Sequence, residues 1–165
     1  MSEVSISPSG ESFPLPGPQE YKTELARVEA LAAAARTEGK EVVVVMGVGF
    51  VGAVMAAIIA DATDQNGAPS KFVIGCQRPS TRSYWKIPLL NRGESPVKAE
   101  DPEVDTLISR CVGDKKTLIA TYNSDCLAFA DCVVVDVQCD YTKNSLGDMK
   151  TGEVEMAALE ATMKT

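Results

Sequence analysis

The sequence contains no histidine, and none of its cysteines forms a Cys-x-x-Cys pair. Zinc sites are built from closely spaced thiolates and imidazoles, so the usual ligand patterns are missing and we expect no metal site. Three of the five cysteines lie within or beside apolar runs, where a small apolar side chain packs well. We therefore interpret the cysteines as reduced core residues; they lie at positions 76, 111, 126, 132 and 139.

Long apolar runs and an excess of positive charge are also absent. No apolar stretch approaches the roughly 18 to 20 residues that cross a bilayer, and residues 1–10 lack the basic and apolar regions of a secretory signal. Acidic residues outnumber basic ones by 23 to 16, and the resulting net charge of −7 would repel a phosphate backbone. We expect no membrane and no nucleic-acid partner, and a cytoplasmic location.

The chain divides at about residue 39 into an amino-terminal part (1–39) and a main domain (40–165). Residues 1–18 hold four prolines between serines and glycines, a composition that disfavours helices and strands, and predict a flexible, disordered arm. Residues 19–38 predict a helix that docks on the main domain, because apolar residues recur there at steps of three and four. These apolar residues are Tyr21, Leu25, Val28, Ala32 and Ala35.

Buried apolar runs alternate with helical patterns in the main domain. The run 42–46 is uninterrupted and mostly β-branched, which is typical of a central strand in a parallel sheet, and a helix is predicted at 50–60. The fold class is therefore α/β, a Rossmann-like, doubly wound parallel sheet. Further strands are predicted at 72–76, 117–121 and 132–137, and further helices at 82–90, 102–111, 124–131 and 153–163. The last helical pattern stops without a cap, so the sequence looks like a fragment.

A glycine-rich turn follows the first predicted strand and opens the first helix. Gly47 permits a tight turn, Gly49 removes the Cβ that would block a pyrophosphate, and Gly52 lets the helix lie close to the strand. Amides of the first helical turn and the helix dipole would face the phosphates. This pattern favours dinucleotide binding over a purely structural glycine turn, and its residues are Gly47, Val48, Gly49, Phe50, Val51 and Gly52.

The second strand lacks the acidic residue that commonly holds the ribose hydroxyls of NAD. It runs instead into Gln77 and Arg78. Gln77 can bond a ribose hydroxyl, and Arg78 either contacts adenine, pairs with a 2′-phosphate, or is simply solvated at the end of a strand. The expected cofactor is NAD, and NADP stays open.

Three segments together resemble the UDP-glucose/GDP-mannose dehydrogenase family. The first is the strand and glycine turn of residues 42–52. The second, Leu90-Asn91-Arg92-Gly93-Glu94-Ser95-Pro96, is similar to the Leu-Asn-x-Gly-x-x-Pro segment of that family, and the third, 130–135, to its Ala-Asp-Val strand beside the cofactor. The resemblance covers about residues 41–165. Gln77-Arg78 and some additional residues before Asn91 look like the branch that handles N-acetylated or related UDP-sugars.

This resemblance implies an enzyme that oxidises the 6-hydroxymethyl group of a nucleotide sugar to a carboxylate, in two hydride transfers through a thioester. The catalytic cysteine and lysine of the family lie in later domains, so we assign no catalytic residue to this chain. The resemblance also implies cofactor contacts at Arg82, Val137 and Gln138, and a homo-oligomer formed through the missing part. Where the family has a Gly-Thr-Pro turn, this chain has Gln138-Cys139-Asp140. Cys139 there is interpreted as filling the space of the threonine.

Two functions from different classes remain. The first is the cofactor-binding domain of a dehydrogenase that acts on a nucleotide sugar, inactive when isolated. The second is a non-catalytic dinucleotide-binding or sensor module. The missing acidic residue and the altered turn after Val137 favour the second.

Overall fold

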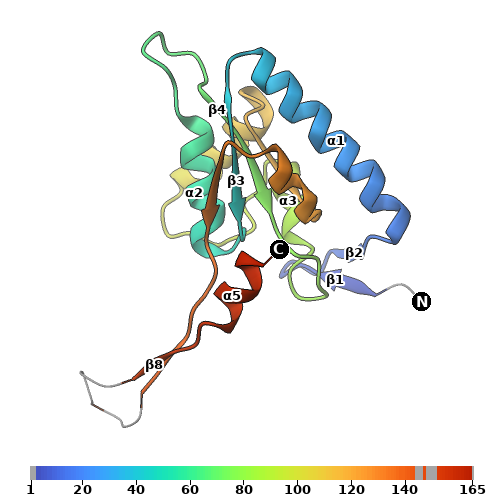
Figure 1. Ribbon diagram of the computed structural model, residues 1–165, viewed down its shortest axis with the longest axis vertical. Coiled ribbons are helices and arrows are strands. Elements are labelled where there is room, and N and C mark those ends of the chain that lie inside the picture. The colour runs from blue at the N-terminus through green and yellow to red at the C-terminus, as the bar shows by residue number, and fades with distance from the viewer. Residues whose placement is uncertain (1–2, 144–146, 148–151, 165) are drawn as a thin grey trace.

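The computed structural model describes residues 3–143, 147 and 152–164. Its centre is a parallel sheet of four strands, β3 (Glu41–Met46), β4 (Lys71–Cys76), β5 (Leu118–Thr121) and β6 (Cys132–Val135), in the order β5-β4-β3-β6 (Figure 1). The predicted central strand is an inner one, between the two predicted neighbours. The expected α/β, Rossmann-like fold is confirmed.

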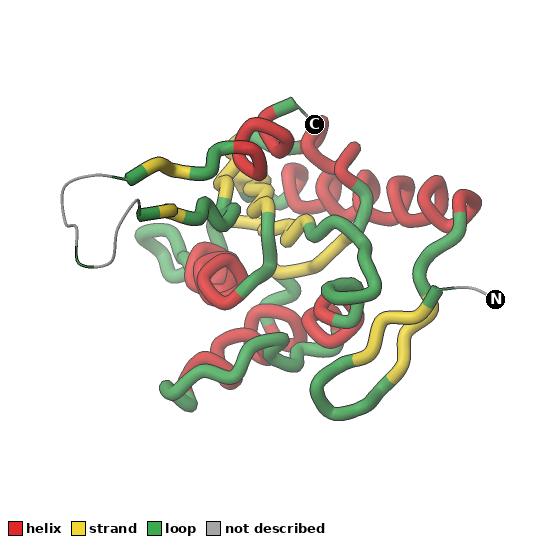
Figure 2. The backbone as a smooth tube through the Cα atoms, turned by 90° about the horizontal axis from the view of Figure 1, so that it is seen from below, coloured by secondary structure: helices red, strands yellow, loops and turns green. Residues whose placement is uncertain are grey.

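Helices cover both faces of the sheet because the inner strands are apolar on both sides. Val43 and Val45 of β3 pack with the alanines of α2 (Phe50–Asp61), whereas Val42 and Val44 pack with α1 (Pro18–Thr37). Figure 2 shows the two helices on opposite sides of the strands. This sandwich explains why the sequence of β3 shows no polar alternation.

Helix α1 matches the predicted amino-terminal helix within one residue at each end. Val28, Ala32 and Ala35 are buried against the sheet, and Tyr21 and Leu25 are half-buried. The side chain of Glu20 accepts a hydrogen bond from the Gly17 amide at the start of the helix. The expected docking face is therefore confirmed.

The shorter helices differ from the predicted ones at their ends. Turns occupy the residues from Ser80 onward before α3 (Lys86–Asn91). The next helix, α4 (Glu103–Ser109), continues into a π-helical turn at 110–114. A 3₁₀ helix spans Ser124–Phe129, and its cap is Asn123, whose side chain accepts from the Asp125 amide, not Ser124 as predicted.

The amino-terminal arm is ordered, and the prediction of a disordered segment at 1–18 is wrong for the described residues. Strands β1 (Val4–Ile6) and β2 (Ser12–Pro14) form an antiparallel hairpin. Ser5 is buried and its hydroxyl accepts a hydrogen bond from the Trp85 amide at 3.2 Å. Composition missed this hairpin because its partners lie some 80 residues away in the sequence.

Strand β6 is less buried than its apolar sequence predicted. It pairs only with β3 among the described strands, and 44% of the Val133 side chain surface is exposed. Cys132 on this strand and Cys139 beyond it are exposed, so the prediction of core cysteines is wrong for these two. An apolar run does not reveal whether a strand has neighbours on both sides.

The last described residues project from the domain. A two-stranded ladder joins β7 (Tyr141–Thr142) to β8 (Glu153–Val154), and α5 (Ala157–Met163) follows (Figure 1). The predicted helix at 153–163 therefore starts only at Ala157, because the residues before it extend into the ladder. Among the described helices, none is long and apolar enough to span a membrane.

Candidate cofactor-binding site

The glycine turn lies where β3 ends and α2 begins. Figure 2, which views the molecule from below, shows the first turn of α2 and the ends of the strands on the same side. In open parallel sheets this edge is where ligands bind, because loops there surround the carboxyl ends of the strands. The geometry of the turn decides whether a dinucleotide fits.

Gly47 and Gly52 are required by close backbone contacts. Gly47 has a φ of +97°, and a Cβ there would overlap the carbonyl oxygen of Asp136. A Cβ on Gly52 would overlap the carbonyl oxygen of Gly47 and would lie 2.6 Å from Oδ2 of Asp136. The two glycines thus hold α2 against β3 and β6, as the sequence suggested for Gly47 and Gly52.

Gly49 differs from both, because the space in front of it is open. A Cβ on this residue would meet no atom within 4 Å, and its φ of −78° is ordinary. Gly49 is the N-cap of α2, and no side chain caps that end of the helix. The missing side chain leaves the first helical turn open, which fits the close approach of a pyrophosphate.

The other residues of the motif divide between core and surface. Val48 is fully buried and points toward Gly75 of β4, where an added Cβ would lie 2.6 Å from Val48 Cγ1. Phe50 is 65% exposed and Val51 54% exposed, so both present apolar surface beside the turn. Only the backbone of Val48 can face a ligand.

Gln77 follows β4 and reaches across to the glycine turn. Its Oε1 accepts a hydrogen bond from the Val48 amide at 3.1 Å, and its own amide donates to the Thr121 carbonyl at 3.0 Å. Nε2 makes only a long contact of 3.5 Å to each of two acceptors, the Ser83 hydroxyl and the Arg78 carbonyl. The side chain therefore holds the turn in place, and its donor group faces the loop that follows β4.

The remaining predicted site residues are spread around the same edge. Arg78 and Arg82 are exposed on the loop after β4, and within the described part of the chain neither guanidinium has an ion pair or hydrogen bond. Val137 is half-buried, and Gln138 is exposed and donates to Asp140 at 2.7 Å. Among the described residues, no hydrogen bond or ion pair links the side chain of Arg82 or Gln138 to the turn.

Asp136 is the site residue that sequence reasoning missed. It follows β6 directly, its amide donates to the Met46 carbonyl, and its carbonyl and carboxylate oxygens line Gly47 and Gly52. The available signal was its place after an apolar run, since parallel strands bring their carboxyl ends to one edge. A third strand therefore contributes to the turn.

The second family-like segment has a structural role in this fold. Asn91 Nδ2 donates to the Ala120 carbonyl at 2.9 Å, and Asn91 Oδ1 accepts from the Ala120 amide at 2.7 Å. The side chain thus pairs with β5 as a neighbouring strand would. Gly93 follows with a φ of +78° beside Ser109.

The aspartate of the third segment lies at the opposite edge of the sheet. Asp131 accepts from the Val42 amide, and Arg36 of α1 donates to the Asp131 carboxylate and to the Phe129 carbonyl. These bonds join α1 to the beginning of β3 and β6. Asp131 therefore organises the sheet from the end away from the turn.

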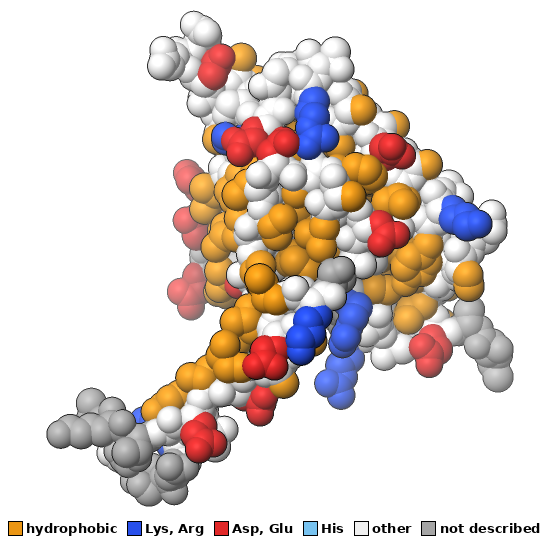
Figure 3. Space-filling view, in the orientation of Figure 1, with side chains coloured by type: hydrophobic (Ala, Val, Ile, Leu, Met, Phe, Trp, Pro, Cys, Tyr) orange, Lys and Arg blue, Asp and Glu red, His pale blue; other side chains and the backbone are white. Residues whose placement is uncertain are grey.

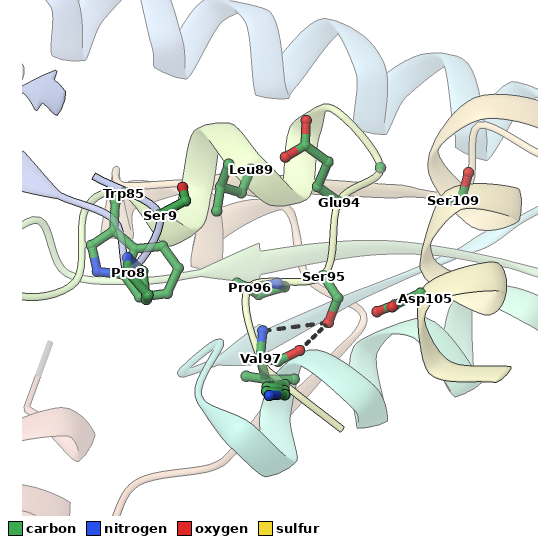
Figure 4. A pocket seen from close by; sticks show the side chains of 12 residues that line it. Pro8, Ser9, Trp85, Leu89, Glu94, Ser95, Pro96, Val97, Asp105 and Ser109 are labelled. Atoms are coloured by element: carbon green, nitrogen blue, oxygen red, sulfur yellow. Dashed lines mark hydrogen bonds between the residues drawn. The ribbon is translucent and has the colours of Figure 1, made fainter. Parts of the chain in front are cut away.

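A cavity of about 590 Å³ lies elsewhere, between the amino-terminal hairpin and the segment before α4. Figure 4 shows Pro8 against Trp85 on one side of the cavity, and Ser95 near Asp105 on the other. The Ser95 hydroxyl forms hydrogen bonds with the backbone of Val97. No residue of the glycine turn lines it. We do not assign the cofactor to this cavity.

Two of the three buried cysteines, Cys111 and Cys126, have thiols whose pKa is raised. Burial raises the pKa of the Cys111 thiol to about 11. A hydrogen bond with Cys76, together with burial, raises the pKa of Cys126. Within the described residues, no group of three or more potential ligands (His, Cys, Asp or Glu) could hold a metal ion.

The fold is Rossmann-like, with a glycine turn between β3 and α2. The structure is similar to the crystal structure of an NDP-N-acetyl-D-galactosaminuronic acid dehydrogenase from Methanosarcina mazei Go1, with a TM-score of 0.61 and 30% sequence identity. The match covers 83% of this chain but only 26% of that dehydrogenase, so the chain spans about a quarter of the length of its neighbour. No family model and no curated protein sequence matches the chain. The likeness is thus to a nucleotide-sugar dehydrogenase, an oxidoreductase.

Proposed function

We propose that the chain binds a nicotinamide dinucleotide at the Gly47–Gly52 turn and serves as the cofactor-binding part of a nucleotide-sugar dehydrogenase. The observation that carries the proposal is that the three glycines have different surroundings. At Gly47 and Gly52 neighbouring backbone occupies the place of a Cβ, whereas Gly49 alone of the three faces open space at the start of a helix. A purely structural turn would not need the third glycine.

The residues around the turn fit the group that the proposal requires. Open space at Gly49 admits the pyrophosphate to the uncapped first turn of α2, whose dipole favours anions. Gln77 holds the Val48 amide and so fixes the turn in advance of binding. When bound, the nicotinamide ring accepts hydride from the substrate.

The reaction that we propose for the whole protein is the oxidation of the 6-hydroxymethyl group of a nucleotide sugar to a carboxylate. Two observations support it: the family resemblance of the sequence motifs, and the likeness to the dehydrogenase from Methanosarcina mazei Go1. An N-acetylated sugar is the favoured substrate class, because the neighbour acts in N-acetylgalactosaminuronic acid chemistry by its name. The described residues would form one wall of that site.

The test is calorimetric titration of the chain with NAD and NADP, before and after the substitution Gly49→Val. Valine adopts the backbone angles of Gly49 without strain, so the fold should be kept. Its side chain fills the open space in front of the first helical turn, so the affinity for both cofactors should fall at least about tenfold. Gly113→Val is the matched control, because Gly113 also faces open space with an ordinary φ and lies in the turn after α4. If neither cofactor binds at millimolar concentration, the proposal fails.

The alternative is a dinucleotide-binding module without chemistry. It is favoured by the residues after β6, where Gln138 bonds Asp140 in place of the Gly-Thr-Pro turn. Both functions require the glycine turn, so binding does not separate them. Turnover of UDP-sugars by a longer form of the protein would support the enzyme, and tight cofactor binding without turnover would support the module.

A further inference from the structure

We infer that the loop of residues 77–83 binds the 2′-phosphate of the adenosine ribose, so that the chain prefers NADP to NAD. This inference rests on the proposed function, since it places a known part of the dinucleotide beside the glycine turn. In this fold the adenosine ribose lies over the end of the second strand of the unit, here β4. The loop follows that strand directly.

The first argument concerns which hydrogen-bonding groups Gln77 has left to offer. NAD is usually held by a carboxylate, which has two acceptor oxygens for the two ribose hydroxyls. Gln77 has one acceptor oxygen, and that oxygen already receives the Val48 amide, which also fixes the orientation of its side-chain amide. Gln77 therefore offers the ribose hydroxyls fewer acceptor sites than a carboxylate does, and its Nε2 donor makes two long contacts of 3.5 Å inside the loop.

The second argument concerns charge. The loop Gln-Arg-Pro-Ser-Thr-Arg-Ser contains two arginines and no acidic residue, in a chain whose net charge is −7. Within the described part of the chain, neither Arg78 nor Arg82 is engaged by an acidic side chain. In the same part, the other four arginines, at 27, 36, 92 and 110, form ion pairs with carboxylates.

Hydrogen bonds inside the loop leave the arginines as its exposed charged donors. The Ser83 hydroxyl donates to the Arg78 carbonyl at 3.1 Å and lies 2.7 Å from the Ser80 hydroxyl, whereas Arg78 and Arg82 are exposed. Figure 3 shows a few Lys and Arg side chains below the centre of the molecule, with Asp and Glu side chains beside them. The two arginines of the loop thus follow β4 directly, where the ribose would lie.

The experiment compares the affinities of NADP and NAD by calorimetry in the chain and in Arg78→Ala and Arg82→Ala variants. We expect NADP to bind at least about tenfold more tightly, and the double variant to lose that difference while its NAD affinity changes less than about twofold. Lys116→Asn is the control for each single arginine variant, because it also removes one positive charge. Lys116 is exposed at the amino end of β5, and asparagine tolerates its φ of +53°.

Smaller probes separate the 2′-phosphate from other anions. Adenosine 2′-phosphate should bind more tightly than adenosine 5′-phosphate, and inorganic phosphate should compete only weakly. Affinity for NADP, but not for NAD, should also fall as the pH drops below about 6, where a phosphate monoester loses its second charge.

These experiments distinguish failure of the NADP inference from failure of the proposed function. If NAD binds as tightly as NADP and the arginine variants change neither, the inference is overturned and the proposed function stands. If inorganic phosphate competes as well as adenosine 2′-phosphate does, the loop is a general anion site and the inference is likewise overturned. If neither dinucleotide binds, the proposed function itself has failed.

Discussion

The three glycines of the turn have different surroundings, and substitutions at Gly52 and Gly49 report on two of them. Alanine at Gly52 places its Cβ against the backbone carbonyl of Gly47, which cannot move without shifting α2 or β3. We expect the free energy of unfolding to fall by about 1–3 kcal/mol, the usual cost of overpacking. Urea denaturation measures it.

Gly49→Ala is the internal control for that prediction. Its Cβ would point into open space, so the unfolding free energy should fall by less than about 1 kcal/mol, the modest cost of losing glycine at an N-cap. Equal losses at Gly49 and Gly52 would contradict the close approach of α2 to the strand.

Asp61 at the end of α2 predicts how stability depends on acid. Hydrogen bonds from Arg110 and Lys115 lower the pKa of its carboxyl from 3.8 to about 2. Because the folded-state value is the lower one, ionised Asp61 stabilises the fold above about pH 4, and this contribution is lost as the pH falls toward about 2. The carboxylate thereby joins α2 to the turn after α4.

The substitution Asp61→Asn should lower the unfolding free energy at pH 7 by about 1 kcal/mol, the scale of a partly exposed ion pair. The difference from wild type should shrink to nothing near pH 2, as measured by urea midpoints along a pH series. Asp114→Asn, which removes a carboxylate without an ion pair in the described chain, should show no such trend. A difference that stays constant with pH would argue against the ion pairs as its cause.

At the residue scale, the sequence predicted contacts between residues close in the chain and missed those between distant residues. The close contact of Gly52 with the Gly47 carbonyl involves residues five positions apart, and the expectation for Gly52 agrees with the structure. The bond from Val48 to Gln77 spans 29 positions, and Asp136 reaches the turn from a different strand. No local pattern encodes such contacts.

At the scale of elements, the long periodic segments were predictable and the short ones were not. Strand β3 and helix α1 carry enough apolar residues to identify them, and their bounds agree within one residue. The amino-terminal hairpin has strands of three residues with a proline at the last position of β2, so its sequence resembles a loop. Its order comes from packing on α3 and the residues near it.

The hairpin therefore contributes to stability. Arg92 donates two hydrogen bonds to the carboxylate of Glu11 and lies over the Phe13 ring at 5.7 Å. Deleting residues 1–16 should lower the melting temperature by roughly 3–6 °C, corresponding to about 1–2 kcal/mol in a chain of this size. Scanning calorimetry measures the shift.

Glu11→Gln serves as the comparison, because it removes the exposed ion pair and leaves the buried Ser5 contact. It should lower the melting temperature by about 2 °C or less. A deletion that leaves the melting temperature unchanged would restore the interpretation of residues 1–18 as a mobile arm.

At the scale of the whole molecule, cofactor binding and folding are linked. A ligand that binds only the folded chain, at a concentration one hundred times its dissociation constant, stabilises it by about 2.7 kcal/mol. Saturating dinucleotide should thus raise the melting temperature by roughly 5–10 °C. Gly49→Val should abolish this shift without lowering the melting temperature of the free chain to a similar extent.

Gly75 influences the glycine turn although it is buried in β4. It leaves room in β4 for the side chain of Val48, so the height of the turn above the sheet is set by an absent methyl group in the adjacent strand. The two positions should therefore covary among related sequences, with a side chain at 75 accompanied by a smaller residue at 48. A family in which alanine at 75 regularly occurs with valine at 48 would contradict this coupling. If the coupling holds, selection on cofactor affinity acts also on position 75, which a comparison of ligand-contacting residues would not include.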